Sequence, residues 1–275
     1  MSERLVAQDL ELAYDSRTVA QGLSVSIPDH SFTVIVGPNA CGKSTLLRAL
    51  ARTITPRAGR VLLDGTDIHR MRPKAVARTL GLLPQTPNAP DGITVADLVA
   101  RGRYPHQTLL RQWSDADEEA VEAAMAATAV TDLRDRLLDE LSGGQRQRVW
   151  IAMALAQETN ILLLDEPTTF LDINHQVEIL DLLVDLNRSR GTTIVMVLHD
   201  LNLGARYADH LVALANGNIH IAGTPEHVLT EETVRADFGV PSRILTDPTS
   251  GRPMMMPIGR HRMLDGFDAA EGSAP

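Results

Sequence analysis

Three runs of apolar residues along the chain have the pattern of buried strands. They extend from Ser31 to Val36, from Asn160 to Leu164 and from Thr192 to Leu198. Continuous apolar runs of this length are typical of parallel strands that are covered on both faces. The pattern therefore predicts an α/β fold with a parallel sheet at its centre.

Two other stretches have different patterns. Residues 4 to 30 contain short alternating apolar pieces, and Val61 to Asp64 reads as a strand that runs into a turn, so a small antiparallel β unit is expected there. Residues 88 to 140 differ, because Ala96 to Ala100 and Asp115 to Val130 are rich in alanine and acids, which favour helices. A helical subdomain is predicted for this part of the chain.

The first of the three strands leads into a glycine-rich loop. The loop has the complete pattern Gly-x-x-x-x-Gly-Lys-Ser, and Leu46, Leu47 and Leu50 follow at helical spacing, so it joins a strand to a helix. Free backbone N–H groups and the helix dipole attract phosphate oxygens at such a helix start. The candidate nucleotide contacts are Gly37, Pro38, Asn39, Ala40, Cys41, Gly42, Lys43, Ser44 and Thr45.

The residue types in this loop suit phosphate binding. Gly37 and Gly42 permit backbone angles and a close approach that side chains would prevent. Lys43 can reach the β- and γ-phosphates as a point charge, Ser44 can offer its hydroxyl to Mg²⁺, and Thr45 would contact the α-phosphate side. The alternative is an ordinary glycine turn that carries an exposed lysine.

Cys41, inside this loop, is the only cysteine of the chain. A disulfide within the chain and a zinc site made of thiols are therefore excluded. A helix start can lower the pKa of a thiol and make it reactive. We favour the simpler interpretation that Cys41 fills a small space in the loop.

Polar side chains follow the other two strands. Asp165 and Glu166 come after one strand, and His199 comes after the other. Because ligands collect at the carboxyl ends of parallel strands, Asp165 can hold Mg²⁺, Glu166 can take a proton from a water that attacks the γ-phosphate, and His199 can hydrogen-bond that phosphate. The alternatives are acids that end a strand only because loops are polar, and a histidine with a local role.

Composition narrows the function further. The chain has 275 residues, a net charge of −9 and 44% hydrophobic residues, which fits one large domain or one domain with a subdomain and argues against a general nucleic-acid surface. No apolar run reaches the roughly 18 residues of a membrane helix, and Met1 to Arg4 do not begin a signal peptide. We expect a soluble, cytoplasmic chain whose transport pore, if it serves one, is a separate polypeptide.

The order of these motifs resembles that of the ATP-binding cassette (ABC) family over roughly residues 4 to 240. The glycine-rich loop corresponds to Walker A, and Ile161 to Asp165 to the Walker B strand. The other family motifs have counterparts at Tyr14 (A-loop), Gln85 (Q-loop), Leu141 to Gln145 (signature), Phe170-Leu171-Asp172 (D-loop) and His199 (switch histidine). The signature is the most specific of them, because kinases and small GTPases share Walker A and lack it.

This resemblance implies a P-loop NTPase fold of the ABC type, with a RecA-like parallel-sheet core, a small antiparallel β part and an inserted helical subdomain at about 88–144. It implies ATP and Mg²⁺ as cofactors, with Ser44, Gln85 and Asp165 at the metal, Glu166, His199 and Gln85 in catalysis, and Tyr14 on the adenine. Ser142, Gly143, Gly144 and Gln145 would cover the ATP of a second copy in a head-to-tail homodimer, and Asp172 is a further nucleotide-binding candidate.

Three segments narrow the resemblance to ferric-siderophore importer ATPases of the ferric-citrate and enterobactin type: Arg101 to His106, Thr168 to Gln176 and Thr246 to Gly251. The likeness implies two integral-membrane permease subunits as partners, an extracellular or periplasmic substrate-binding protein as an indirect partner, and a peripheral position at the cytoplasmic face of the membrane. The alternatives are a cobalamin, haem or other metal-chelate importer, an exporter, and a soluble non-transport ABC ATPase of repair or translation.

Two expectations concern the periphery of the molecule. Arg101 to His106 reads as an exposed basic and aromatic patch that would line a groove for a helix of the membrane subunit, with a solvated polar loop as the alternative. Charge reversal at Arg101 and Arg103 would then uncouple uptake from ATPase activity. Residues 241 to 275 are expected to form a short extension with a loose end from about Asp268, too short for a regulatory domain.

Overall fold

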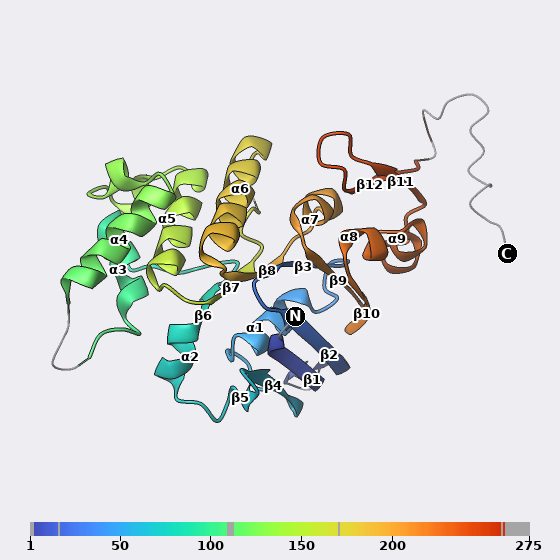
Figure 1. The fold of residues 1–275 in the computed structure, drawn as a ribbon, viewed down its shortest axis with the longest axis horizontal. Helices are drawn as coiled ribbons and strands as arrows, with labels where there is room; N and C mark the ends of the chain where they lie inside the picture. The colour runs from blue at the N-terminus through green and yellow to red at the C-terminus, as the bar shows by residue number, and fades with distance from the viewer. Residues whose placement is uncertain (1–2, 16, 109–112, 170, 260, 262–275) are drawn as a thin grey trace.

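The computed structural model describes residues 3–15, 17–108, 113–169, 171–259 and 261, and at its centre lies a six-stranded sheet (Figure 1). The strand order is β10-β9-β3-β8-β7-β6. The strands are β3 (Phe32–Val36), β6 (Leu80–Leu83), β7 (Ile161–Asp165), β8 (Thr193–Val197), β9 (His210–Ala215) and β10 (Asn218–Gly223). All neighbours are parallel except β9 and β10. The three strands expected from the apolar runs, β3, β7 and β8, are confirmed and lie side by side.

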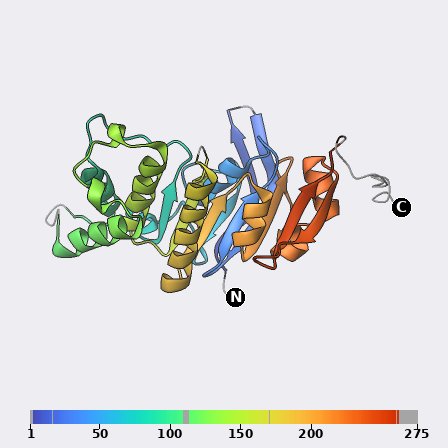
Figure 2. The same ribbon diagram turned by 90° about the horizontal axis from the view of Figure 1, so that it is seen from above.

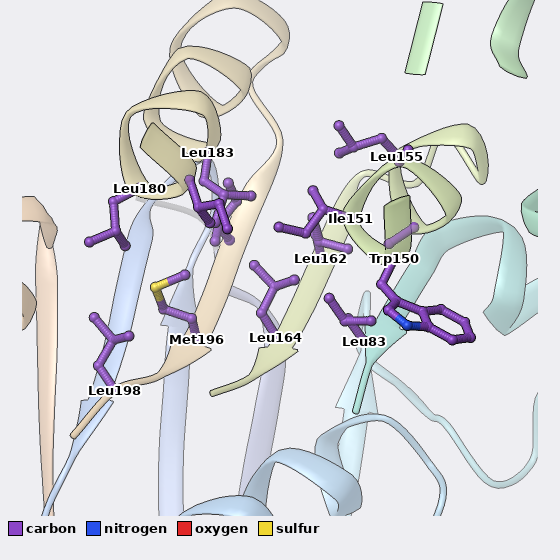
Figure 3. Packing of buried hydrophobic residues seen from close by; sticks show 14 of the residues in the cluster. Leu83, Trp150, Ile151, Leu155, Leu162, Leu164, Leu180, Leu183, Met196 and Leu198 are labelled. Atoms are coloured by element: carbon purple, nitrogen blue, oxygen red, sulfur yellow. The ribbon is translucent and has the colours of Figure 1, made fainter. Parts of the chain in front are cut away.

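The apolar runs are continuous because this sheet is buried on both faces. Leu162, Leu164 and Met196 lie on one side of the sheet, beneath α6 (Ile173–Arg190) and α5 (Gly143–Ala156) (Figure 3). The same core includes residues of α7 (Leu201–Tyr207). Leu163 and Val195 point to the other side, where α1 (Lys43–Leu50) and the antiparallel sheet lie. Successive residues of one strand therefore enter two different cores. A polar residue at either position would be buried without water, which costs free energy of folding.

The small antiparallel β unit is also confirmed. Its sheet has the order β2-β1-β4-β5, made of β1 (Glu3–Tyr14), β2 (Arg17–Pro28), β4 (Ala58–Leu63) and β5 (Thr66–Asp67). β1 pairs with both β2 and β4, and the β1–β2 hairpin brings Tyr14 opposite Arg17. This hairpin lies on the same side of the central sheet as α1 (Figure 1).

Helices dominate the stretch after β6, as predicted. They are α3 (Val95–Ala100), a short 3₁₀ helix (Arg101–Arg103), α4 (Asp115–Ala127), two further 3₁₀ turns (Thr131–Leu133 and Leu138–Glu140) and α5; α2 (Pro73–Thr79) precedes β6. Ser114 caps α4 by accepting the backbone N–H of Asp117, and α4 ends before Ala129, which has a φ of 53°. α5 packs against both α3 and α4 and also reaches β6, so it joins the helical part to the central sheet.

The segment from Arg101 to His106 differs from its sequence-based expectation. Arg103 is only 4% exposed, and its guanidinium donates to Asp117 Oδ1 at 2.9 Å, to the carbonyl of Ala156 at 2.7 Å and to Glu158 Oε2 at 2.8 Å. The prediction of an exposed basic patch is therefore wrong for Arg103, although Tyr104 is 59% exposed. Arg103 is an internal brace between α4 and α5, and reversing its charge would test stability rather than coupling.

Replacing Arg103 with alanine is expected to lower the free energy of unfolding by about 3–5 kcal/mol, because Asp117 would be left as a buried, unpaired carboxylate. Urea denaturation followed by circular dichroism measures the change. Arg101→Ala, in the same short helix at a half-buried position, is the matched control and should shift stability by less than about 1 kcal/mol. Equal losses for the two variants would contradict the bracing role.

The C-terminal extension contains an ordered hairpin that the sequence analysis did not predict. After α8 (Pro225–Val228) and α9 (Glu231–Phe238), strands β11 (Ser242–Thr246) and β12 (Pro253–Pro257) pair antiparallel. The amide of Asn202 on α7 donates to the carbonyl of Met255 at 3.1 Å and accepts its N–H at 2.7 Å, which fixes the hairpin to α7. The hairpin and the helical part lie at opposite ends of the molecule (Figure 2). The loose end expected from Asp268 lies outside the described residues.

Among the residues that the structure describes, no helix is both long and apolar enough to cross a bilayer.

Candidate functional site

The glycine-rich loop lies between β3 and α1, as the sequence predicted. A side chain at Gly37 would meet the carbonyl oxygen of Leu214 at 2.1 Å, so only glycine fits against β9 there. Gly42, which precedes α1, has a φ of 108°, a conformation that favours glycine. Lys43 is 5% exposed, and its Nζ donates to the carbonyls of Gly37 and Pro38, each at 2.9 Å. The loop thus closes around its own lysine and holds the ammonium group at its centre.

Asp165, at the carboxyl end of β7, faces the start of α1. Its Oδ1 accepts the Ser44 hydroxyl at 2.7 Å, whereas its buried Oδ2 accepts no hydrogen bond and lies 3.9 Å from an Arg48 nitrogen. Burial raises the pKa of Asp165, and the Ser44 hydrogen bond opposes that rise. A buried carboxylate oxygen that accepts no hydrogen bond, beside a serine hydroxyl, offers the oxygen ligands that a hard cation such as Mg²⁺ prefers.

A metal site formed by protein side chains alone would need several ligands close together. The part of the chain that the structure describes holds no group of three or more histidine, cysteine, aspartate or glutamate side chains suited to a metal ion. Mg²⁺ commonly takes one or two protein ligands and completes its shell with water and substrate phosphates. The pair Ser44 and Asp165 therefore fits a cation that arrives with a nucleotide.

Glu166 is the centre of a polar cluster at the same edge of the sheet. Its Oε1 lies 2.7 Å from His199 Nε2, and its Oε2 accepts Gln85 Nε2 at 2.6 Å and the Thr169 hydroxyl at 3.1 Å. Glu166 is 8% exposed and has a φ of 52°, which turns its side chain out of the direction of β7. Gln85 and His199, which follow β6 and β8, thus meet around the carboxylate of Glu166, which follows β7.

An open cavity of ≈ 570 Å³ connects these groups. It is lined by residues of the glycine-rich loop and by Gln85, Glu166, His199 and the half-exposed Tyr14. The sequence analysis missed Arg17 and Val19, which also line it. The β1–β2 pairing places both residues near Tyr14, so locating the hairpin turn more closely would have found them.

The signature residues do not line this cavity. Ser142 caps α5 by accepting Gln145 N–H at 3.3 Å, and Gln145 Oε1 accepts the N–H of Ser142 at 3.1 Å, a reciprocal capping box. Asp172, also outside the cavity, caps α6 by accepting His175 N–H at 3.0 Å. Phe170 of the D-loop lies outside the described residues. The structure therefore brings together one part of the predicted site and leaves the signature and Asp172 at a second surface.

Cys41 is 7% exposed, and burial raises the pKa of its thiol although Lys43 opposes the rise. A thiol that resists ionisation is a poor nucleophile. The packing interpretation of Cys41 therefore fits its surroundings better than the reactive one.

Comparison with known proteins gives consistent results. The family model described as "ABC transporter" matches residues 20–169. The ferric enterobactin transport ATP-binding protein FepC of Escherichia coli (strain K12) is 54% identical over 257 residues, which are 94% of this chain and 95% of that protein. The cobalamin import ATP-binding protein BtuD of Halobacterium salinarum is 44% identical over 91% of this chain and 62% of its own length. A solved structure described as a metal-chelate type ABC transporter in an inward-facing conformation superposes with a TM-score of 0.81 at 29% identity, covering 94% of this chain and 99% of that one.

Proposed function

The chain belongs to the ABC transporter family, and from this premise we propose that it is the ATP-hydrolysing subunit of an importer of iron(III)–siderophore complexes. The observation that carries the ATPase assignment is the single cavity shared by the glycine-rich loop, Gln85, Glu166 and His199. The siderophore assignment rests on relatives: identity is 54% to the enterobactin protein and 44% to the cobalamin protein.

The geometry supports a direct route for hydrolysis. The loop N–H groups and Lys43 would bind the phosphates, Tyr14 would stack on the adenine, and Thr45 would contact the α-phosphate. Ser44 and Asp165, with Gln85, would hold Mg²⁺, which when bound neutralises charge on the β- and γ-phosphates. These residues would orient the γ-phosphate toward the carboxyl ends of β7 and β8, where Glu166 and His199 lie.

Glu166 is placed to act as general base. It would take the proton of the attacking water, and His199 would hydrogen-bond the γ-phosphate. Both oxygens of Glu166 are engaged, Oε1 by His199 and Oε2 by Gln85 and Thr169. A carboxylate has about four acceptor sites, so Oε1 keeps one site for water, and release of Gln85 would free another on Oε2. Gln85 would be released by moving with the helical part that follows β6, which would link catalysis to a motion of residues 88–144.

The surface that carries Ser142 to Gln145 completes the proposal. These residues do not line the cavity of their own chain, yet they form a helix start suited to phosphate. A second copy placed head to tail would cover each nucleotide with this surface. Two integral-membrane permease subunits would receive the motion, and an external substrate-binding protein would deliver the solute. In this arrangement residues 4–240 form the cassette, the chain lies peripherally at the cytoplasmic face of the membrane, and nucleic acid has no part.

Uptake of radiolabelled iron–siderophore complexes by cells lacking this gene tests the proposal. Uptake is expected to be lost, to return with the wild-type gene and to stay absent with Glu166→Gln, because transport needs turnover and not only binding. Copurification of membrane subunits from a detergent extract separates a transporter from a soluble ABC ATPase. Normal uptake of both hydroxamate and catecholate siderophores by the deletion strain would contradict the iron assignment, with cobalamin and haem as the next substrates to assay.

A further inference from the structure

His175 lies between two motifs that are separate in the sequence, the D-loop and the signature. Its ring Nδ1 lies 2.7 Å from Asp172 Oδ1, and because a carboxylate only accepts, Nδ1 is the donor. The hydrogen bonds from the backbone and ring of His175 lower the pKa of Asp172, so the acceptor stays ionised near neutral pH. His175 is thus held in one orientation by the acid of the D-loop.

The far edge of the same ring lies against the first turn of α5. A Cβ built on Gly144 would be 3.1 Å from His175 Cδ2 and 3.4 Å from its Nε2. Gly144 is helical and needs no unusual backbone angle, so the ring of His175 is a physical reason for the missing side chain. At Gly143, by contrast, a Cβ would meet nothing within 4 Å. One turn further along both helices, Arg148 and Glu178 form an ion pair at 3.5 Å.

The loop between Glu166 and α6 is held from the same turn. Gln176 donates to the carbonyls of Leu171 at 3.1 Å and Thr168 at 3.3 Å. Thr169 in turn donates to Glu166. A continuous series of contacts therefore runs from the proposed base, through this loop and His175, to the start of α5.

We propose that His175 is a positioning residue that couples the loop carrying Glu166 and Asp172 to the first turn of α5, so that the two ATP sites of the dimer respond to each other. The inference rests on the proposed function, in which Glu166 serves the ATP of its own chain and Gly144 covers the ATP of the partner. Each chain then carries one rigid connection between the two sites. A displacement of Glu166 at one ATP site therefore moves Gly144 at the other ATP site.

The test compares steady-state ATP hydrolysis by the purified full-length wild type with His175→Ala. For the wild type we expect a Hill coefficient for ATP of about 2, the number of sites. His175→Ala should lower it to about 1 and also reduce kcat. The Kd of a fluorescent ATP analogue for the cavity of one chain should change by less than about twofold, since His175 does not line that cavity.

Two further variants separate positioning from general damage. His175→Asn keeps a donor for Asp172 and is expected to restore most of the cooperativity. Asn174→Ala, on the neighbouring exposed residue, whose amide donates to Glu178, should leave the Hill coefficient unchanged. Gly144→Ala should lower the Tm of the otherwise wild-type chain by about 3 °C, because the added methyl group meets the ring. In the His175→Ala chain it should leave the Tm unchanged or raise it, because the ring is gone and alanine favours the helix.

The outcomes distinguish the inference from its premise. A cooperative wild type with an equally cooperative His175→Ala overturns the role of His175 and leaves the proposed function intact. A wild type with a Hill coefficient of 1, together with coupled Tm changes at Gly144 and His175, confirms the contact but removes the paired-site premise and the inference with it.

Discussion

Replacing Glu166 with glutamine is expected to leave ATP binding intact and to lower kcat by about 10³-fold, within the 10²–10⁴ range of general-base catalysis. The amide has the shape of the carboxylate, so its oxygen can still accept from Gln85 and Thr169 while its nitrogen faces His199. The fold of the cluster is preserved, but the side chain at position 166 can no longer take the proton of the attacking water.

Single-turnover hydrolysis and binding of a fluorescent ATP analogue measure the two effects separately. Size-exclusion chromatography with ATP and Mg²⁺ should show the variant as a persistent dimer, since bound nucleotide is no longer consumed. Glu232→Gln, the same chemical change at an exposed position on α9, is the control and should retain wild-type turnover. Hydrolysis by Glu166→Gln at the wild-type rate would show that another group, or the phosphate itself, accepts the proton.

Lys43→Ala is expected to weaken ATP binding itself, by about 10²-fold in Kd. The ammonium group is buried at the centre of the loop, and hydrogen bonds to charged groups contribute about 1.5–3 kcal/mol, or roughly 10- to 150-fold in affinity. The substitution also leaves the carbonyls of Gly37 and Pro38 without their donor, so the empty loop loses its closed shape.

Isothermal titration with ATP and Mg²⁺ measures this loss. The chain contains only one other lysine, Lys74 on α2, which makes Lys74→Ala the matched control; its ammonium donates to the carbonyl of Gln107 and lies outside the cavity. Glu166→Gln and Lys43→Ala should therefore differ in kind: the first binds ATP and does not hydrolyse it, whereas the second does neither. Unchanged affinity in Lys43→Ala would contradict the proposed phosphate contact.

The sequence was most informative where a local pattern determines local structure. β3, the glycine-rich loop and α1 follow one another within 19 residues, from Phe32 to Leu50, and strand, loop and helix each have their own pattern. The meeting of Glu166 and His199 also followed, because parallel strands end at one edge of a sheet. Gln85 was expected only from the family resemblance, since no strand was predicted before it. What each of these residues does in hydrolysis stays a prediction.

Sequence reasoning failed where a side chain depends on distant partners. Arg103 reads as a surface cation, yet its acceptors come from Asp117, Ala156 and Glu158, up to 55 positions away. The hairpin of β11 and β12 was missed because its stability depends on Asn202, far back in the chain. Neither relation leaves a periodic signal, since each depends on one side chain reaching one backbone or carboxylate group.

The burial of Arg103 also limits how such chains can be recombined. Tyr104 is exposed, which makes the segment around it an obvious stretch to exchange between relatives when its predicted contact with a membrane subunit is tested. The exposed residues, however, are attached to a guanidinium whose acceptors lie in α4 and at the end of α5. If residues 101–106 alone were replaced by those of a relative, the new residue at position 103 would have to fit acceptors that are arranged for the guanidinium of Arg103. The smallest transferable unit is therefore the segment together with Asp117 and Glu158, a discontinuous module rather than a loop.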